Sequence, residues 1–370
     1  MRHFGTVKRV VVKIGSALIT NHGQGLAHQA IQNWVQQITR LDAVDTVLVS
    51  SGAVAAGRVV LGWSERPREI YKLQAAAAVG QTHLVQTYED YFRQQQRHCA
   101  QILLTHADVA DRQRYLNARR TLITLLELNV VPIVNENDTV ATDEIRFGDN
   151  DTLAASVANL IEADLLIILT DQQGVFDHDP SLQPDAELIQ SIDCFDPQLD
   201  EVAGPSQNAL GRGGMLTKIM AARQAAHAGT QTVIAHGLTD QILSKVIQGQ
   251  PEGTWLQASQ KMTARKRWLA GHKIAGQVRL DQGAVSQLQH QGASLLAIGI
   301  QAVKGQFERG DLITCEYEGR EIARGLSNYS SQELQKLKGQ HSDLIAEVLG
   351  YVAEPEVIHR DNLVLNVSQY

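Results

Sequence analysis

Six short apolar runs, separated by longer amphipathic segments, are the feature that most constrains the fold of the first two thirds of the chain. The segments with helical spacing include 27–41, 70–96, 117–128, 151–161 and 216–228. The apolar runs are 10–14, 46–49, 101–104, 130–134, 165–169 and 232–235. Apolar strands that alternate with helices are typical of a mostly parallel sheet covered by helices on both faces. We therefore expect an α/β domain that binds its ligands at the carboxyl ends of the strands.

The pattern changes near residue 258. Residues 259–273 carry a basic cluster around 261–267 beside Trp268, and we expect them to form a linker. Beyond it the apolar runs are short and glycines are frequent, with candidate strands at 274–280, 294–298, 299–303, 311–317 and 321–326. Short strands with closely spaced turns favour a small β-barrel or sandwich. The predicted domains are therefore 1–258 (α/β) and 274–370 (β), joined by a linker at 259–273.

Composition excludes several classes of protein. Apolar residues make up 44% of the chain and charged residues 20%, as in folded proteins rather than disordered ones. The net charge of -7 argues against a chain whose main task is wrapping nucleic acid. No apolar run approaches the ~18 residues of a membrane helix, and the first residues lack the apolar stretch of a signal peptide. The three cysteines (Cys99, Cys194 and Cys315) form no C-x-x-C pair, which favours a reducing cytoplasm.

The residues at the ends of the first two apolar runs are suited to anion binding. Lys13 lies inside the first run, where its charge would be buried unless the side chain points into a site or reaches solvent at the strand end. The second run leads into 50–57, where small residues and glycines let backbone N–H groups at a helix start approach an anion. Small residues also serve tight packing between a strand and a helix, so that segment alone is a weak signal.

Two polar segments follow the fourth run. Residues 135–139 read Asn-Glu-Asn-Asp-Thr, and residues 146–151 read Arg-Phe-Gly-Asp-Asn-Asp. Either segment alone fits an ordinary turn. Together they supply carboxylates, which can hold an ammonium group, and amides, which can hold a carboxylate. That combination suits an amino-acid substrate.

A glycine-rich segment at 211–218, Gly-Arg-Gly-Gly-Met-Leu-Thr-Lys, precedes a predicted helix. Backbone amides at such a helix start can hold phosphates, and the lysine adds a positive charge. The segment is not a P-loop, because the chain contains no Gly-Lys dipeptide, and Leu216 occupies the third glycine position of a dinucleotide fingerprint. Phosphate binding by a different scheme is therefore expected.

Taken together, these segments resemble those of the glutamate 5-kinases in the amino acid kinase family, joined to a C-terminal PUA domain. The resemblance covers essentially the whole chain in order. It also includes 74–80 and the Leu-Asn-Ala-Arg sequence at 116–119. Its main motifs are Val-Val-Lys13-Ile-Gly-Ser, Ser51-Gly-Ala-Val-Ala-Ala-Gly-Arg58, Asn135-Glu-Asn-Asp138, Gly148-Asp-Asn-Asp151, Thr170-Asp-Gln-Gln-Gly and Gly213-Gly-Met-Leu-Thr-Lys218. It implies ATP-dependent phosphorylation of the side-chain carboxylate of L-glutamate, the first step of proline biosynthesis.

The resemblance also implies roles for individual residues. Lys13 and Lys218 would contact the ATP phosphates, and Asp151 would organise the two lysines. The implied glutamate ligands are Ser51, Asp138 and Asn150, with Asn135 and Asp149 nearby. The implied ATP site comprises Lys13, Thr170, Asp171, Arg212, Gly213, Gly214, Met215, Leu216, Thr217 and Lys218. The family often has a small residue at the position of Arg212, so no side-chain role is carried over there.

Further expectations follow from the same resemblance. Mg²⁺ would accompany ATP, and no residue of the chain is assigned as its ligand. Proline would inhibit the enzyme at or beside the glutamate pocket, through the loop at 138–151. Family members look like dimers or tetramers, so we expect a homo-oligomer, and the next enzyme of the pathway is a further candidate partner. No membrane partner is expected.

Two other functions compete with this interpretation. A kinase of the same family that acts on acetylglutamate or aspartate would share the sheet and the lysines, but residues 135–138 and the C-terminal domain favour free glutamate. An RNA-binding function is the other alternative, because PUA domains commonly accompany RNA enzymes. Residues 271–370 hold 9 Lys+Arg and 12 Asp+Glu, a net charge of -3, which argues against phosphate-dependent RNA binding. A basic patch in the linker, at 261–267, keeps that alternative open.

Overall fold

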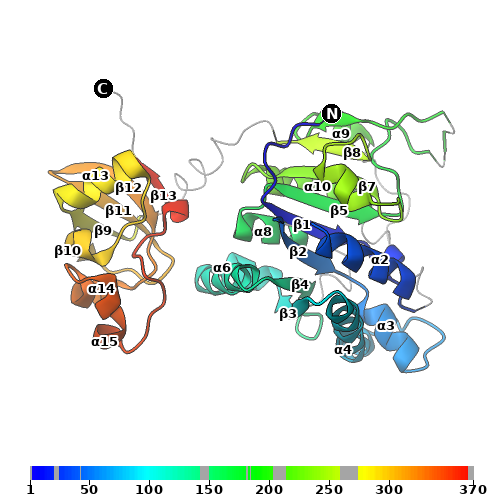
Figure 1. The fold of residues 1–370 in the computed structure, drawn as a ribbon, viewed down its shortest axis with the longest axis horizontal. Coiled ribbons are helices and arrows are strands. Elements are labelled where there is room, and N and C mark those ends of the chain that lie inside the picture. The colour runs from blue at the N-terminus through cyan, green and yellow to red at the C-terminus, as the bar shows by residue number, and fades with distance from the viewer. Residues whose placement is uncertain are drawn as a thin grey trace. The chain divides into compact units, whose positions relative to one another are not determined.

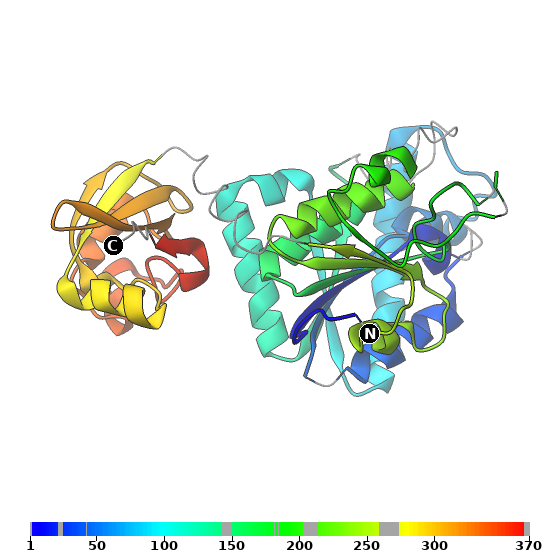
Figure 2. The ribbon, with the colours of Figure 1, turned by 90° about the horizontal axis from the view of Figure 1, so that it is seen from above.

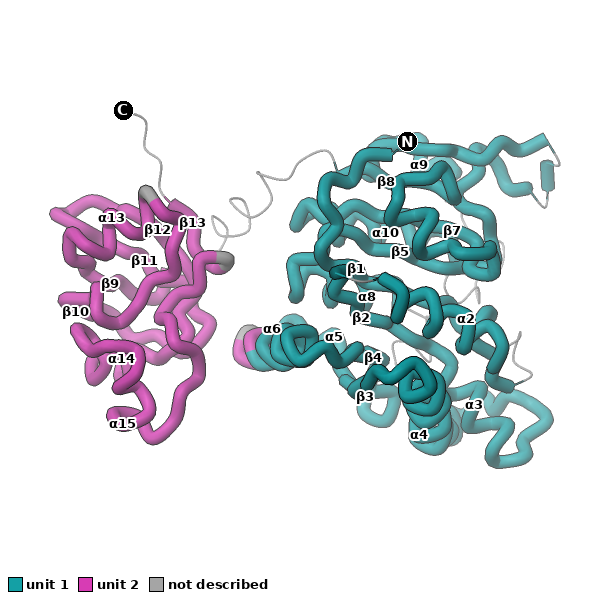
Figure 3. Tube along the Cα trace, in the orientation of Figure 1, with its two compact units in different colours: residues 1–110, 117–261 teal, residues 111–116, 262–370 magenta. Residues whose placement is uncertain are grey.

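The computed structural model describes residues 2–20, 25–41, 43–141, 150–180, 182–183, 185–202, 214–258 and 274–365. The chain divides into two compact units (Figure 3). Unit 1 comprises 1–110 and 117–261, and unit 2 comprises 111–116 and 262–370. The predicted linker at 259–273 lies outside the described residues, so the boundaries at 258 and 274 stay predictions.

Unit 1 is built on an eight-stranded sheet (Figure 1). The strand order is β3-β4-β2-β1-β5-β7-β8-β6, and among the described strands of this sheet only β7 and β8 pair in antiparallel fashion. The strands are β1 (Arg9–Ile14), β2 (Asp45–Ser50), β3 (His98–Leu104), β4 (Val130–Glu136), β5 (Leu165–Thr170), β6 (Ser191–Asp193), β7 (Gln231–His236) and β8 (Thr254–Gln257). The predicted mostly parallel sheet is therefore confirmed, with β1, β2, β4 and β5 at its centre.

Helices cover both faces of this sheet, as Figure 2 shows from above. On one face α2, α4 and α11 pack their apolar side chains against β1, β2, β4 and β5, and together they form one apolar core cluster of unit 1. On the other face α8 lies against β1 and β5, and α10 lies against β7 and α8. The described helices before residue 258 are α1 (Ser16–Ile19), α2 (His28–Thr39), α3 (Ala53–Val60), α4 (Ile70–Gln94), α5 (His106–Ala110), α6 (Arg112–Glu127), α8 (Asn150–Ile161), α9 (Gln198–Val202), α10 (Met215–Ala226) and α11 (Ile242–Ile247), and the first residues of α6 belong to unit 2.

The topology brings the polar segments of the sequence to one edge of the sheet. Because β1, β2, β4 and β5 are parallel neighbours, their carboxyl ends lie side by side. Residues 13–16, 50–53, 135–138 and 170–171 follow or end these four strands. The α8 and α10 helices begin at 150 and 215, in the two other polar segments.

Unit 2 contains a five-stranded sheet of order β10-β9-β11-β12-β13. The strands are β9 (Gly276–Leu280), β10 (Ile300–Gly305), β11 (Leu312–Tyr317), β12 (Arg320–Leu326) and β13 (Leu363–Leu365). The predicted strand at 294–298 is wrong: Leu295 forms a single bridge with Ile358, and 297–299 are a 3-10 helix. Closure of the sheet into a barrel stays a prediction.

Unit 2 also contains helices that the sequence interpretation missed: α13 (Gln282–Gln291), α14 (Ser331–Leu337) and α15 (Ile345–Leu349). Their signals are local. Asp281 caps α13 by accepting from the backbone N–H of Ala284, and Ser330 and Glu333 form a capping box at the start of α14. Within the residues that the structure describes, no helix is long and apolar enough to cross a membrane.

Candidate active site

Three buried charges meet at the centre of the sheet edge. Lys13 on β1 places its Nζ 2.5 Å from Oδ1 of Asp151, and Lys218 on α10 places its Nζ 3.1 Å from Oδ2 of the same carboxylate. Their side chains are 4%, 0% and 5% exposed for Lys13, Asp151 and Lys218, respectively. Thr217 donates a further hydrogen bond to Asp151, at 2.8 Å. One carboxylate therefore holds two ammonium groups in a place that water hardly reaches.

Burial and charge act in opposite directions on these groups. Burial by itself would raise the pKa of Asp151, but the two lysine charges and the hydrogen bonds outweigh it and hold the pKa at about 2. The pKa of Lys218 is lowered because burial disfavours its charged form more than Asp151 favours it. The cluster carries two positive charges against one negative charge. It is therefore suited to receive an anion.

Local structure explains how each of these side chains reaches the site. Lys13 lies near the carboxyl end of the buried strand β1, so its side chain leaves the sheet where the strand ends. Asp151 lies in the first turn of α8, where the helix dipole stabilises a negative charge. Lys218 lies in the first turn of α10, after Gly214, and this start of a helix presents backbone N–H groups to an anion.

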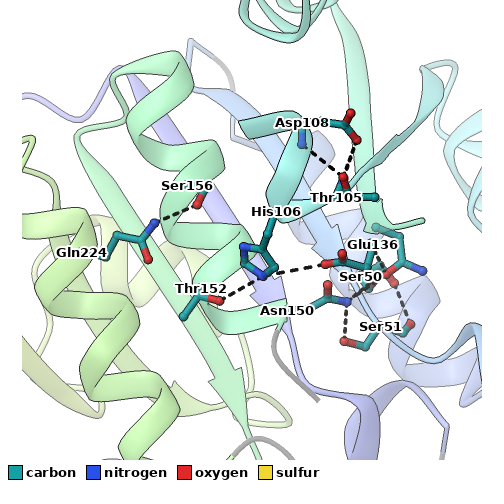
Figure 4. Close-up of polar contacts among 11 residues, drawn as sticks. Ser50, Ser51, Thr105, His106, Asp108, Glu136, Asn150, Thr152, Ser156 and Gln224 are labelled. Atoms are coloured by element: carbon teal, nitrogen blue, oxygen red, sulfur yellow. Dashed lines mark hydrogen bonds and ion pairs between the residues drawn. The ribbon is translucent and has the colours of Figure 1, made fainter. Parts of the chain in front are cut away.

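A set of amide and hydroxyl side chains lies beside the charged cluster. The Nδ2 of Asn150 lies 2.8 Å from Ser51 Oγ and 2.9 Å from Asn135 Oδ1, and it also contacts the backbone carbonyl of Ser50 at 3.3 Å (Figure 4). Ser51, Asn135 and Asn150 are at most 2% exposed. Because Asn150 precedes Asp151 in the same helix turn, this amide set and the charged cluster form one continuous site.

The structure describes most of the residues that the sequence predicts for the site. It brings Lys13, Asp151, Thr217 and Lys218 into direct contact, and it does the same for Ser51, Asn135 and Asn150. Thr170 ends β5 and donates a hydrogen bond to Asp171 at 3.1 Å. Gly214, Met215 and Leu216 lie at the start of α10, where the Leu216 side chain is exposed. Asp149, Arg212 and Gly213 lie outside the described residues.

Asp138 lies apart from these contacts but close to the same edge of the sheet. Its side chain is buried and lines a cavity of about 220 Å³ beside the carboxyl ends of β3 and β4. Gln81 and Thr82 of α4 line the same cavity, as do Glu136 and Thr139. The site therefore continues from the charged cluster, across the amide set, to a space that a small molecule could enter.

Several site residues were missed by the sequence interpretation. Glu136 is a fully buried carboxylate, with His106 Nε2 at 3.9 Å from its Oε2 (Figure 4). The same His106 nitrogen lies 3.4 Å from the hydroxyl of Thr152, so His106 connects the end of β4 with the start of α8. His106 lies two residues after the third apolar run, and the rule that ligands bind after the strands would have indicated it. Gln81 has no such signal, because it lies within the long helix α4.

The geometry of the site can be compared with the requirements of metal binding and of phosphoryl transfer. Among the described residues, no group of three or more His, Cys, Asp and Glu side chains is placed to hold a metal ion. The two lysines and the helix starts can instead stabilise phosphate oxygens, while amides and carboxylates can bind an amino acid. The arrangement therefore fits transfer of a phosphoryl group to an amino-acid substrate.

Comparison with known proteins agrees with this reading. Residues 8–236 match the model of the amino acid kinase family, and residues 276–349 match the PUA domain. The chain is 58% identical over 363 residues to a protein of Paraburkholderia xenovorans named glutamate 5-kinase, an alignment that covers 97% of this chain and 98% of that protein. It is 57% identical over the same length and the same shares to a glutamate 5-kinase of Pseudomonas fluorescens. A glutamate 5-kinase of Herminiimonas arsenicoxydans is 56% identical over 365 residues, again with 97% and 98% covered.

Proposed function

The chain belongs to the amino acid kinase family, and from this premise we propose that it transfers the terminal phosphoryl group of ATP to the side-chain carboxylate of L-glutamate. The product is L-glutamyl 5-phosphate, and the reaction is the first step of proline biosynthesis. The observation that carries the proposal is the pair Lys13 and Lys218 held on Asp151, directly beside the amide set of Ser51, Asn135 and Asn150.

The chemistry of the reaction needs charge compensation more than proton transfer. A glutamate side chain has a pKa near ~4.3, so at neutral pH it is already the nucleophile and needs no general base. The difficulty is that an anion must approach a polyanionic triphosphate. Phosphoryl transfer is catalysed mainly by positioning and by electrostatic stabilisation. The buried ammonium groups of Lys13 and Lys218 supply both the positioning and the electrostatic stabilisation. Asp151 fixes their positions, and the cluster keeps a net positive charge.

We assign the nucleotide to the side of the site formed by β5 and α10. Thr170, Asp171 and the segment at 212–218 would line it, with the first N–H groups of α10 facing the phosphates. Mg²⁺ would enter with ATP, held by the phosphate oxygens of the co-substrate. In this scheme Asp151 is not a ligand of Mg²⁺, because its carboxylate already contacts Lys13, Lys218 and Thr217.

We assign L-glutamate to the side of the site formed by β2, β4 and the start of α8. The Ser51 hydroxyl accepts from Asn150, and since its proton has no acceptor among the described residues it can donate to the reacting carboxylate. Asn135 and Asn150 would hold the substrate beside it, and Asp138 would accept from the ammonium group. Asp149 belongs to the same proposal. We also propose that proline inhibits the enzyme at this pocket, that the chain works as a homo-oligomer in the cytoplasm, and that the next enzyme of the pathway is a candidate partner.

The proposal is tested by trapping the acyl phosphate with hydroxylamine in the presence of ATP and Mg²⁺. We expect hydroxamate to form with L-glutamate and far less with N-acetylglutamate or L-aspartate, and we expect added proline to reduce its rate. Lys13→Ala and Lys218→Ala should each lower turnover by about a hundredfold or more while the protein stays folded. Preference for another carboxylate, or normal turnover in either lysine variant, would refute the assignment.

A further inference from the structure

Gln81, which the proposed function does not use, lies at the end of the amide set. It is part of α4 and is 9% exposed. Its Oε1 accepts a hydrogen bond from Asn135 Nδ2 at 2.7 Å. Asn135 in turn accepts from Asn150, so a chain of three buried amides connects Gln81 with the start of α8. The order along this chain is Gln81, Asn135, Asn150 and Ser51.

Backbone groups fix the orientation of each amide in this chain. The N–H of Glu136 can only donate, and it donates to Oδ1 of Asn135 at 2.9 Å. The other end of that amide, Nδ2, therefore faces Gln81 and donates to its Oε1. At the far end, the Ser50 carbonyl can only accept, so it fixes Nδ2 of Asn150 as the donor. Gln81 cannot rotate its amide by a half turn without placing two donors together.

In this fixed orientation, the Nε2 group of Gln81 is a buried hydrogen-bond donor that takes no part in the amide chain. Among the residues that the structure describes, Nε2 has no hydrogen-bond acceptor. A buried donor without an acceptor is unfavourable, and such groups call for an explanation. Gln81 lines the cavity of about 220 Å³, which is large enough for a small molecule. An acceptor inside that cavity would satisfy the donor.

We propose that Gln81 is a specificity-determining residue whose Nε2 donates to the α-carboxylate of the amino-acid substrate. The inference rests on the proposed function. The order of the side chains in the amide chain indicates which of the two substrate carboxylates Gln81 binds. The reacting carboxylate must lie near Lys13 and Lys218, which share Asp151, next to Asn150. Gln81 is at the opposite end of the chain and receives the carboxylate that is farther from the lysines. Asp138 lines the same cavity and can accept from the neighbouring ammonium group.

The test compares L-glutamate with 4-aminobutyrate, which keeps the amino group and the reacting carboxylate but lacks the α-carboxylate. We expect Gln81→Leu to lower kcat/KM for L-glutamate by about tenfold to a hundredfold, the usual loss for a hydrogen bond to a charged group. The variant should leave kcat/KM for 4-aminobutyrate, or its inhibition constant against L-glutamate, within about threefold. An equal loss with both compounds would overturn the inference, because Gln81 would then only support Asn135.

A second variant guards against damage to the fold. Gln81→Glu keeps an oxygen to accept from Asn135 but replaces the donor by an oxygen, so it should lower use of L-glutamate at least as much as Gln81→Leu and again spare 4-aminobutyrate. Wild-type kinetics of Gln81→Glu with L-glutamate would overturn the inference. The matched control is Gln86→Leu on the same helix, whose exposed side chain bonds only Asp90 in the described residues, and it should change neither substrate. Failure of the proposed function is separate, because the unmodified protein would then form no glutamyl hydroxamate.

Discussion

At the scale of single residues, the main energetic problem of this site is the burial of Lys13, Asp151 and Lys218. A buried charge is costly unless it is paired and hydrogen-bonded, and removal of one partner leaves an uncompensated charge. Asp151 contacts both lysines, with its carboxylate oxygens 2.5 Å from Nζ of Lys13 and 3.1 Å from Nζ of Lys218. The fold can therefore hold two ammonium groups ready for phosphates because one carboxylate separates and neutralises them in part.

Asp151→Asn should cost the fold about 3–5 kcal/mol of its free energy of unfolding, because it removes the buried carboxylate charge that Lys13 and Lys218 share, and it should also abolish turnover. The pH dependence follows from the same charge. The folded pKa of about 2 lies below the ordinary value of 3.8, so the ionised carboxylate stabilises the fold above pH 4 and this contribution is lost as the pH falls toward 2. Urea unfolding from pH 5 to 2 should show a loss of about 2 kcal/mol in the wild type that is absent in the variant.

The control for this experiment is Asp90→Asn. Asp90 forms a surface ion pair with Arg93, and its side chain is 44% exposed. The substitution should therefore change the free energy of unfolding by no more than about 0.5 kcal/mol. If Asp151→Asn and the wild type lost stability in parallel as the pH falls, the argument for Asp151 would fail.

Asp138→Ala should act mainly on the amino-acid substrate. Asp138 lines the cavity beside β4, whereas Thr170 at the end of β5 and the start of α10 form the proposed nucleotide side, so that side should be less disturbed. Loss of a charged acceptor for an ammonium group should raise KM for L-glutamate by about tenfold or more, with KM for ATP changed less than threefold. Steady-state kinetics with each substrate varied in turn measures the split. Equal increases in both constants would contradict the assignment.

Single residues also show what a sequence can reveal about a site. Lys13 could be predicted because a charge inside an apolar strand needs a reason, and Ser51, Asn135 and Asn150 could be predicted because they follow strands or open a helix. Gln81 could not, because its role depends on a hydrogen bond to Asn135, 54 residues away in the chain. The helical pattern predicts the face of α4 on which Gln81 lies, but it does not predict that its side chain bonds Asn135.

At the scale of elements, the crossing of α3 and α4 fixes one wall of the site. Their backbones approach so closely that a Cβ atom on Gly80 would lie 1.8 Å from the carbonyl oxygen of Ala53, and one on Gly57 would lie 1.8 Å from that of Ala76. Ala53 opens α3 two residues after Ser51. The spacing of the two helices therefore determines where the Ser51 loop lies, and glycine is needed on both helices.

Gly80→Ala should consequently destabilise unit 1 by about 1–3 kcal/mol or more and should lower kcat/KM for L-glutamate, because the two helices must separate at the Ser51 loop. The matched control is Gly283→Ala, another helical glycine, where the nearest atom is a side-chain oxygen of Asp281 at 3.3 Å. There the nearest atom belongs to a side chain rather than to the backbone, so the same substitution should change the free energy of unfolding by less than about 1 kcal/mol. Thermal unfolding of both variants checks the prediction, and similar behaviour of the two would contradict it.

Elements were predictable where the sequence pattern is long and regular. All six apolar runs are strands of the large sheet, and the pattern placed them within a few residues. The α6 helix begins at Arg112, five residues before the predicted start at 117, because its polar first turn has no apolar periodicity. In unit 2 the run at 294–298 mimics a strand, yet its apolar residues Leu295 and Ala297 pack into the core from an irregular segment and a 3-10 helix.

At the scale of the whole molecule, the two parts of the chain can be compared by their net charge and by their apolar cores. The net charge is -4 for residues 1–270 and -3 for residues 271–370, so neither part attracts anions through its total charge. Among the described residues, the groups placed to attract ATP and glutamate are Lys13, Lys218 and the N–H groups at the start of α10. Each unit also has its own apolar core, one around Trp34, Tyr88 and Phe92 and the other around Tyr329 and Phe307.

Because every described residue of the proposed site belongs to unit 1, a fragment of residues 1–258 should retain the chemistry. We expect its turnover and both KM values to remain within about threefold of those of the full chain, since the apolar cluster around Trp34, Tyr88 and Phe92 contains, among the described residues, none that belongs to unit 2. The measurement is the hydroxamate assay on the purified fragment, with circular dichroism to verify that it is folded. A folded fragment that has lost turnover would show that residues after 258 take part in catalysis, and the division of labour between the units would have to be revised.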